Sequence, residues 1–159
     1  MSEQEQQVRV ETRRIFMRDL SFESPHAVKG LEGKDWKTEI NLNVNPQSIG
    51  LGDNLFEVRL RSTVTCRNKK KTIYVVEVVQ AGIFFIAGLA EEQRKKVLNT
   101  FCPNMLFPYI RETVDGLLVK GGFPPLMLAP INFDALYEQS RQEQTNEKDP
   151  EEGTKRVMH

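Results

Sequence analysis

The residue types that most often carry out chemistry are few in this chain and poorly placed for it. Of the two histidines, His26 follows a proline and His159 is the last residue, so neither is expected to act as a fixed base or metal ligand. Cys102 completes the apolar stripe of a predicted helix, which indicates a buried thiol rather than a nucleophile. We therefore predict no enzyme, no metal site and no cofactor.

Patterns that bind nucleotides or pair carboxylates for catalysis are also missing. The glycine-containing segments 30–33, 50–52 and 121–122 match neither the dinucleotide-binding nor the phosphate-loop pattern, so they are interpreted as turns. The paired glutamates at 91–92 and 151–152 are neighbours on polar faces. An acid–base pair requires two carboxylates that converge in a pocket, so these pairs are interpreted as surface charges.

The charge balance argues against a nucleic-acid-binding protein. The chain has 22 basic and 22 acidic side chains among 159 residues, and its net charge is zero. Nucleic-acid-binding proteins draw most of their affinity from an excess of Lys and Arg. The basic run at 67–71 is interpreted as a solvated hairpin turn, with a contact patch as the alternative.

The expected location is the cytoplasm, without insertion into a membrane. The longest apolar stretch, 81–90, is half of the ~20 residues that a membrane helix needs. The amino-terminal residues lack the basic start and apolar run of a secretory signal. Cys66 and Cys102 form no Cys-x-x-Cys pair and have apolar neighbours, so we expect reduced, buried thiols.

Alternation of apolar and polar residues predicts strands at 8–22, 36–44, 56–66 and 73–79. Pro46 is expected to end the second strand, because proline donates no hydrogen bond to a sheet. The last strand is apolar on both faces except at Glu77, so helices or another subunit should cover it. Short connections favour an antiparallel meander.

Helical periodicity takes over in the second half. A helix is predicted to open at Glu91 and to stop at Pro103, and a second should run over 108–120 with an apolar stripe. Three prolines make 123–130 an extended crossover, after which Asn132 can cap a last helix. The expected class is therefore α+β, with one domain over residues 1–137 and a helix end followed by a polar, disordered tail over 138–159.

Apolar residues border the predicted crossover more densely than a small monomer requires. Phe22, Trp36 and Phe56 precede it, and it carries Phe123, Leu126, Met127 and Leu128. Each aromatic residue is readily explained as core. As a set beside an irregular segment, they indicate an open apolar groove and hence a binding module.

Four long segments together resemble the SecB protein-export chaperone family. They are DLSFESP at 19–25, GIFFIAG at 82–88, CPNMLFPYIRE at 102–112 and GFPPLMLAPINFDAL at 122–136. The resemblance implies a four-stranded antiparallel sheet with helices on one face. It also implies that two chains pair their sheets and that two dimers meet through the helix at 108–120 as a tetramer. The oligomer interface it implies includes Val76, Val78, Gln80, Ile110, Val114 and Leu117.

The function implied by the resemblance is ATP-independent holding of unfolded precursor proteins and their delivery to the SecA motor. The implied client groove contains Phe22, Trp36, Leu126, Leu128, Phe133 and Tyr137, and the implied SecA-binding positions are Asp19, Glu23, Val75 and Glu77. A local salt bridge is the alternative reading of Glu77. A chaperone dedicated to one partner, such as a toxin–antitoxin pair, is the alternative function.

The chain departs from the family pattern in charge and in its tail. Members are usually strongly acidic, whereas this chain is neutral, so SecA binding should be weaker or more sensitive to salt. The carboxyl tail of the family commonly contacts a zinc-bearing tail of SecA. The different final sequence here, EEGTKRVMH, leaves that second contact open.

Overall fold

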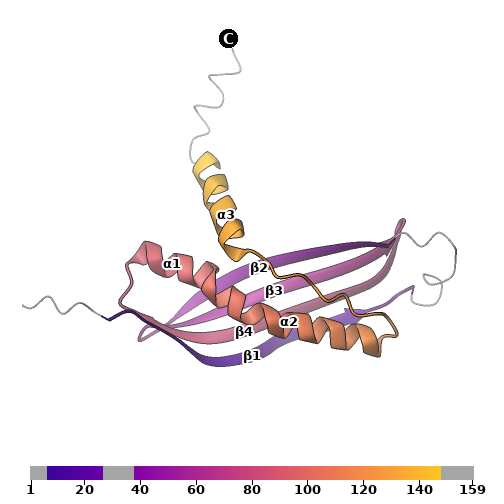
Figure 1. Ribbon diagram of the computed structural model, residues 1–159, viewed down its shortest axis with the longest axis horizontal. Helices are drawn as coiled ribbons and strands as arrows, with labels where there is room; N and C mark the ends of the chain where they lie inside the picture. The colour runs from indigo at the N-terminus through magenta and orange to yellow at the C-terminus, as the bar shows by residue number, and fades with distance from the viewer. Residues whose placement is uncertain (1–6, 27–37, 148–159) are drawn as a thin grey trace, which may run out of the picture.

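The described part of the chain forms one four-stranded sheet followed by three helices (Figure 1). A computed structural model describes residues 7–26 and 38–147. The helices α1 and α2 lie on one face of the sheet, so the predicted α+β class is confirmed. The elements are β1 (Arg9–Glu23), β2 (Thr38–Gly52), β3 (Leu55–Asn68), β4 (Lys71–Ala87), α1 (Glu91–Asn99), α2 (Phe101–Lys120) and α3 (Phe133–Glu147).

The strand order differs from the predicted meander. The sheet is antiparallel with the order β1-β4-β3-β2, so β1 pairs with β4 rather than with β2. The strand β4 is apolar on both faces and runs to Ala87, well beyond the predicted end at Val79. Such a strand is best placed in the sheet interior with a partner on each side, and β1 supplies the second partner.

The strand β2 continues through Pro46, where the sequence predicted its end. Pro46 lies opposite Leu60 of β3, and pairing extends to Gly52. The proline is tolerated because β2 is an edge strand, whose outward side needs no donor for a ladder. The turn that follows places Asp53 and Asn54 in the left-handed region, with φ of 54° and 63°. These short polar residues tolerate that region and close the β2–β3 hairpin.

The two faces of the sheet differ sharply in burial. Alternate residues of β3 and β4 point toward α2 on what we call the helix side, and their apolar side chains form the core together with one face of α2. The other face, the open side, has no helix over it in the described part of the chain. Fully buried core side chains include Leu60, Val64, Phe84, Leu106 and Ile110.

The boundary between the first two helices was predicted incorrectly. The helix α1 ends at Asn99, and Cys102, Pro103 and Pro108 all belong to α2. Pro103 lies in the first turn of α2, where a backbone N–H has no partner within the helix and its loss costs little. The predicted opening at Glu91 is confirmed, and Lys95 Nζ lies 3.6 Å from its carboxylate.

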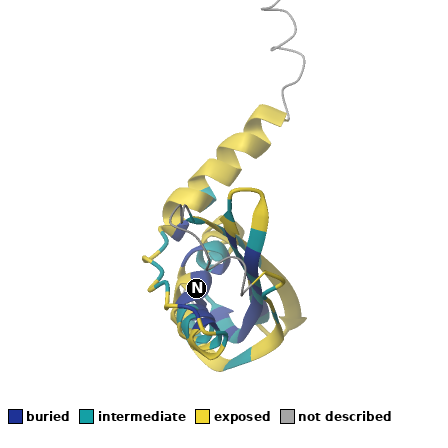
Figure 2. Cartoon of the chain, turned by 90° about the vertical axis from the view of Figure 1, so that its right-hand side faces the viewer, coloured by how far each residue is buried: buried dark blue, intermediate teal, exposed yellow. Residues whose placement is uncertain are grey.

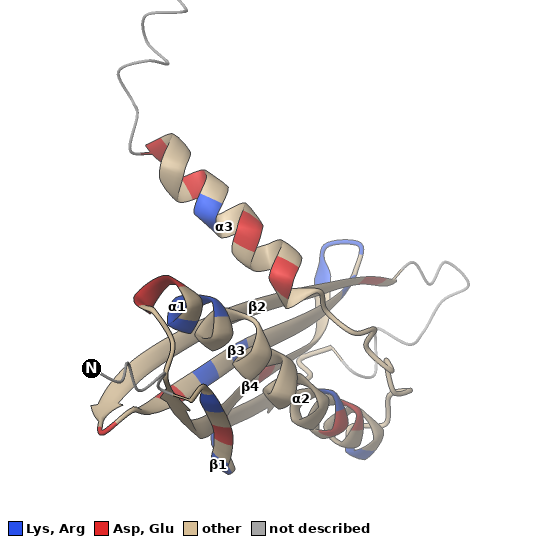
Figure 3. Ribbon diagram, turned by 60° about the vertical axis from the view of Figure 1, so that its left-hand side comes forward, with Lys and Arg blue, Asp and Glu red and all other residues tan. Residues whose placement is uncertain are grey.

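The last helix begins where the sequence predicted and projects away from the sheet. The side-chain oxygen of Asn132 accepts a 3.0 Å hydrogen bond from the Ala135 N–H and so caps α3. The helix runs to Glu147 and is mostly exposed (Figure 2), and acidic and basic residues lie along it (Figure 3). The predicted loop at 30–35, Trp36 and residues 148–159 lie outside the described residues. None of the described helices is both long and apolar enough to span a membrane.

Candidate functional site

The segment 123–132 joins α2 to α3 without secondary structure, and we call it the crossover (Figure 1). Its first residue, Phe123, is 5% exposed and lies between two other rings. The ring centroid of Phe123 is 4.9 Å from that of Tyr74 and 6.5 Å from that of Phe22. At the far end, Phe133 packs edge to face on Phe107 with centroids 6.2 Å apart. The crossover is therefore anchored to the core at both ends.

Between its anchors the crossover carries apolar side chains that are only half buried. Leu126, Leu128 and Ile131 pack against the core yet keep part of their surface exposed. Leu42 and Val44 of β2 do the same on the helix side of the sheet. We call the three crossover residues, Leu126, Leu128 and Ile131, the crossover surface. Partly exposed apolar groups in an irregular segment are typical of a binding surface.

The residues predicted for the client groove do not all belong to this surface. Leu126 and Leu128 lie on it, and Phe22 joins it through Phe123. Phe133, by contrast, is 3% exposed and is part of the core. Trp36 lies outside the described residues.

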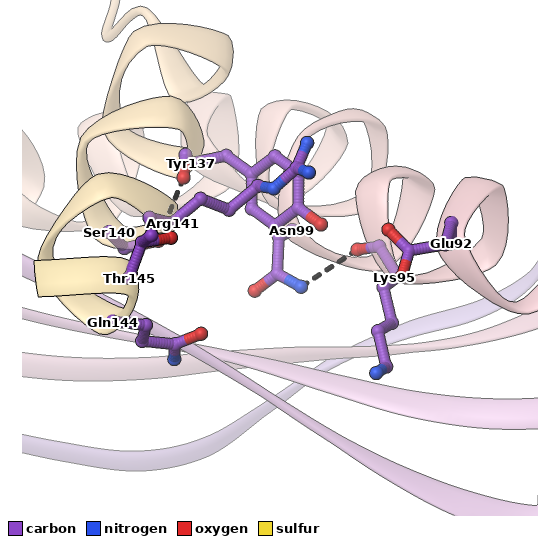
Figure 4. Close-up of a pocket in the computed structure, with 8 residues that line it drawn as sticks. All are labelled: Glu92, Lys95, Asn99, Tyr137, Ser140, Arg141, Gln144 and Thr145. Atoms are coloured by element: carbon purple, nitrogen blue, oxygen red, sulfur yellow. Dashed lines mark hydrogen bonds between the residues drawn. The ribbon is translucent and has the colours of Figure 1, made fainter. Parts of the chain in front are cut away.

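Tyr137 lines a different and polar pocket of about 420 Å³ between α1 and α3 (Figure 4). The guanidinium of Arg141 lies 5.7 Å from the centroid of the Tyr137 ring. Across the pocket, the side-chain amide of Asn99 donates a 2.8 Å hydrogen bond to the Lys95 carbonyl oxygen. This pocket offers charged and amide groups, so its lining does not extend the apolar crossover surface.

On the open side, the structure brings together the four positions predicted to bind SecA. In the β1–β4 pairing, Glu23 lies opposite Val75 and Asp19 lies opposite Val79, two residues from Glu77. Residues opposite or two apart on paired strands share a face, so Asp19, Glu23, Val75 and Glu77 form one surface. We call it the acidic open surface. The alternative reading of Glu77 is also present, because Arg61 donates to its carboxylate and forms an ion pair.

A buried carboxylate lies on the open side near the start of β3. Glu57 of β3 is 4% exposed and accepts hydrogen bonds of 2.6 Å from Arg18 and 2.5 Å from Arg59. Burial alone would raise the pKa of Glu57, but the two arginines outweigh it and hold the pKa below its usual value. Glu57 thus links β1 to β3 across the intervening strand β4.

Comparison with known proteins identifies the family. The family described as "Preprotein translocase subunit SecB" matches residues 3–144. The chain belongs to the SecB family. A protein-export protein SecB of Marinomonas sp. (strain MWYL1) is 48% identical over 134 residues, 84% of each chain. The same protein of Hahella chejuensis (strain KCTC 2396) is 46% identical over 143 residues, 89% of each chain.

A solved structure confirms the fold. A SecB-like chaperone of Mycobacterium tuberculosis, solved with a peptide from an antitoxin, has a TM-score of 0.65 and 23% identity to this chain. The match covers 77% of this chain and 91% of the other. The predicted resemblance and the SecB-like fold are therefore confirmed. Membership of SecB gives the chain the role of a holding chaperone in protein export, and the relatives do not favour the toxin–antitoxin alternative.

The residues that the SecB resemblance placed at the oligomer interface lie mostly inside this single chain. Val76, Val78, Ile110 and Val114 have no exposed surface, and Gln80 is 4% exposed. Leu117 is half buried. The fully buried side chains among them pack within this chain, where α2 lies on β4.

A different set of α2 residues faces outward. Phe101, Met105, Tyr109 and Val119 are between 38% and 60% exposed. At 100° per residue they fall within a quarter of the helix circumference, together with Gly116, around whose Cα an added Cβ would meet no neighbour. We call these five residues the outer stripe. The sequence analysis missed it because the stronger stripe of α2 faces the sheet.

Both thiols have the buried environment that the sequence predicted. Burial raises the pKa of the Cys66 thiol and raises that of Cys102 to about 12. Burial also raises the pKa of Tyr74. A thiol held protonated in the core is a poor nucleophile, so these groups act as packing residues.

Proposed function

We propose that the crossover surface binds extended apolar segments of unfolded precursor proteins and so keeps them from folding or aggregating. The observation that carries this proposal is a row of half-exposed apolar side chains, Leu126, Leu128 and Ile131, on a segment anchored at both ends. Burial of apolar area stabilises such contacts by roughly 25 cal/mol per Å². The role needs neither ATP nor a cofactor, and we propose that the protein is not an enzyme.

Client selection in this proposal is kinetic. A rapidly folding protein buries its apolar segments before capture, whereas a slowly folding precursor leaves them open. Each contact is weak, but several surfaces on one oligomer act on the same client chain. The second contact then forms at a high effective concentration, so the overall affinity exceeds that of any one surface.

We propose that delivery uses the acidic open surface as the docking site for SecA. Asp19 and Glu23 are exposed, and Glu77 keeps a third of its side-chain surface open even while it pairs with Arg61. The neutral net charge predicts that SecA binding is weaker or more sensitive to salt than is usual for the family.

We propose a homotetramer, built as a dimer of dimers, in which the outer stripe of α2 joins the two dimers. A largely apolar exposed stripe, interrupted by Glu112 and with a flat spot at Gly116, suits close packing against another helix. Val76, Val78 and Gln80 are buried in β4 below α2, so they would affect assembly by fixing the position of α2. The proposed location is the cytoplasm, where precursors are still unfolded.

The test measures two affinities with the same set of variants. Wild type, Leu126→Asp, Asp19→Ala and Glu77→Ala are titrated with an unfolded precursor and, separately, with SecA. We expect Leu126→Asp to weaken only client binding and the two acidic variants to weaken only SecA binding. Binding of precursor without binding of SecA at low salt would remove the delivery role and favour a chaperone with a dedicated partner.

A further inference from the structure

One residue at the centre of the crossover is unusual in both exposure and backbone. Met127 is 77% exposed, the highest value among the exposed large apolar residues of the described chain. Its φ is +51°, in the left-handed region that side chains with a Cβ adopt at a cost. A residue other than glycine keeps this strained backbone conformation only where contacts with its neighbours hold it in place.

Asp115 of α2 makes the contacts that hold this backbone conformation. Its Oδ1 accepts hydrogen bonds from the backbone N–H of Leu126 at 3.0 Å and of Met127 at 3.2 Å. The crossover forms no sheet or helix of its own, so these two N–H groups have no ladder to join. One carboxylate oxygen therefore satisfies both donors and ties the middle of the crossover to α2.

The consequence is a fixed direction for three successive side chains. Leu126 and Leu128 turn toward the core and remain half buried, while Met127 between them stays in solvent. Glycine would adopt the same backbone at less cost, so the side chain of Met127 is not explained by the turn itself. Methionine is flexible and polarizable and is favoured on surfaces that bind many different apolar partners.

We propose that Met127 is an additional client contact, for extended apolar segments of unfolded polypeptides, and that Asp115 is the positioning residue that holds it out. This inference rests on the proposed holding function of the crossover surface. The exposed methionine adds apolar area beside Leu126 and Leu128 and adapts its shape to different clients. Asp115 removes the need for the client to order the crossover, which lowers the entropic cost of binding.

The test uses labelled, reduced and carboxymethylated α-lactalbumin, which stays unfolded, as the client probe in fluorescence anisotropy titrations. Met127→Asn keeps a residue that tolerates the left-handed region and removes the apolar side chain. We expect its Kd to rise roughly tenfold, because one buried apolar side chain is lost from each contact. Met127→Leu should stay within about twofold of wild type. Val8→Asn, at another exposed apolar position outside the crossover, is the matched control and should leave the Kd unchanged.

The positioning role has its own readout. Asp115→Ala should speed amide hydrogen exchange at Leu126 and Met127 by roughly tenfold or more and should raise the Kd, since the two N–H groups lose their acceptor. Asp115→Asn keeps an oxygen at the same place and should restore part of both properties. Circular dichroism establishes that each variant is folded.

The outcomes separate this inference from the proposed function. If wild type fails to bind the probe, the holding function is wrong and the inference falls with it. If wild type binds and Met127→Asn binds equally well, the holding function stands and Met127 is no client contact. If Met127→Asn weakens binding but Asp115→Ala does not, the positioning role of Asp115 is refuted.

Discussion

Replacement of Glu57 by glutamine tests how the open side of the sheet is held together. The variant keeps the size of the side chain and removes the charge that Arg18 and Arg59 share. Hydrogen bonds to a charged group contribute roughly 1.5–3 kcal/mol each. The two arginine side chains are 44% and 32% exposed, so solvent screens much of this contribution. We expect Glu57→Gln to lose about 2 kcal/mol of stability in total.

That loss is large enough to measure by thermal unfolding. For a chain of this size, 1 kcal/mol corresponds to roughly 2–4 °C in Tm, so the variant should melt about 4–8 °C below wild type. The measurement is differential scanning calorimetry at one fixed protomer concentration, because assembly also raises Tm. Glu11→Gln is the matched control: Glu11 also pairs with two arginines, Arg9 and Arg13, but its ion pairs are exposed, so its Tm should not change.

The pH dependence of the difference tests the cause. The pKa of Glu57 is lowered in the folded chain, so its ionised form stabilises the fold. This contribution is complete above the unfolded value of roughly 4.3 and is lost as pH falls through the lower folded value. The Tm gap between wild type and Glu57→Gln should thus be constant from neutral pH to about 5 and should close under acid. A gap absent at pH 7, or one that persists in acid, would refute the reasoning.

Three further predictions concern the crossover, the helix layer and the thiols. In Gly121→Ala the new Cβ would lie 2.6 Å from the ring of Phe22. We therefore expect the variant to lose about 1 kcal/mol of stability and to bind clients more weakly. An unchanged client affinity would contradict this. Tyr109→Glu places a charge on the outer stripe and should lower the mass measured by light scattering from the four chains of the proposed tetramer to two, and an unchanged mass would contradict the proposed interface. Cys66 and Cys102 should react with a thiol reagent at pH 8 only as fast as the chain unfolds, and rapid native labelling would contradict their burial.

The sequence patterns predicted which face of each strand is buried better than they predicted which strands are neighbours in the sheet. The alternation in β3 correctly separates a buried face from a wetter one, because the period of a strand is local. The pairing of β1 with β4 depends on which surfaces the whole chain can cover, and no local period records that. Pro46 was misjudged for the same reason, since its tolerance depends on an edge position that only the assembled sheet defines.

Some residues of the proposed sites could be predicted from the sequence, and others depend on contacts that only the folded chain makes. Glu77 stood out as a charge in an apolar strand, and the structure places it on the open side with Asp19 and Glu23. Nothing in the sequence near Asp115 points to the N–H groups of residues 126 and 127, because that contact joins positions eleven and twelve apart through the turn after α2. Phe133 was predicted to line a groove although it is buried, since an apolar side chain has the same signature in a core and in a binding surface.

The separation of the two proposed surfaces has a mechanistic consequence. The crossover surface lies on the helix side of the sheet, and the acidic open surface lies on the opposite face. A holding chaperone that uses no ATP cannot drive release by its own chemistry, so release must follow from the second partner. Opposite faces allow SecA to dock while the client is still bound, and the weak individual apolar contacts can then pass one by one to the motor. Competition of the two partners for one surface would instead release the client into solution, where it could fold or aggregate before transfer.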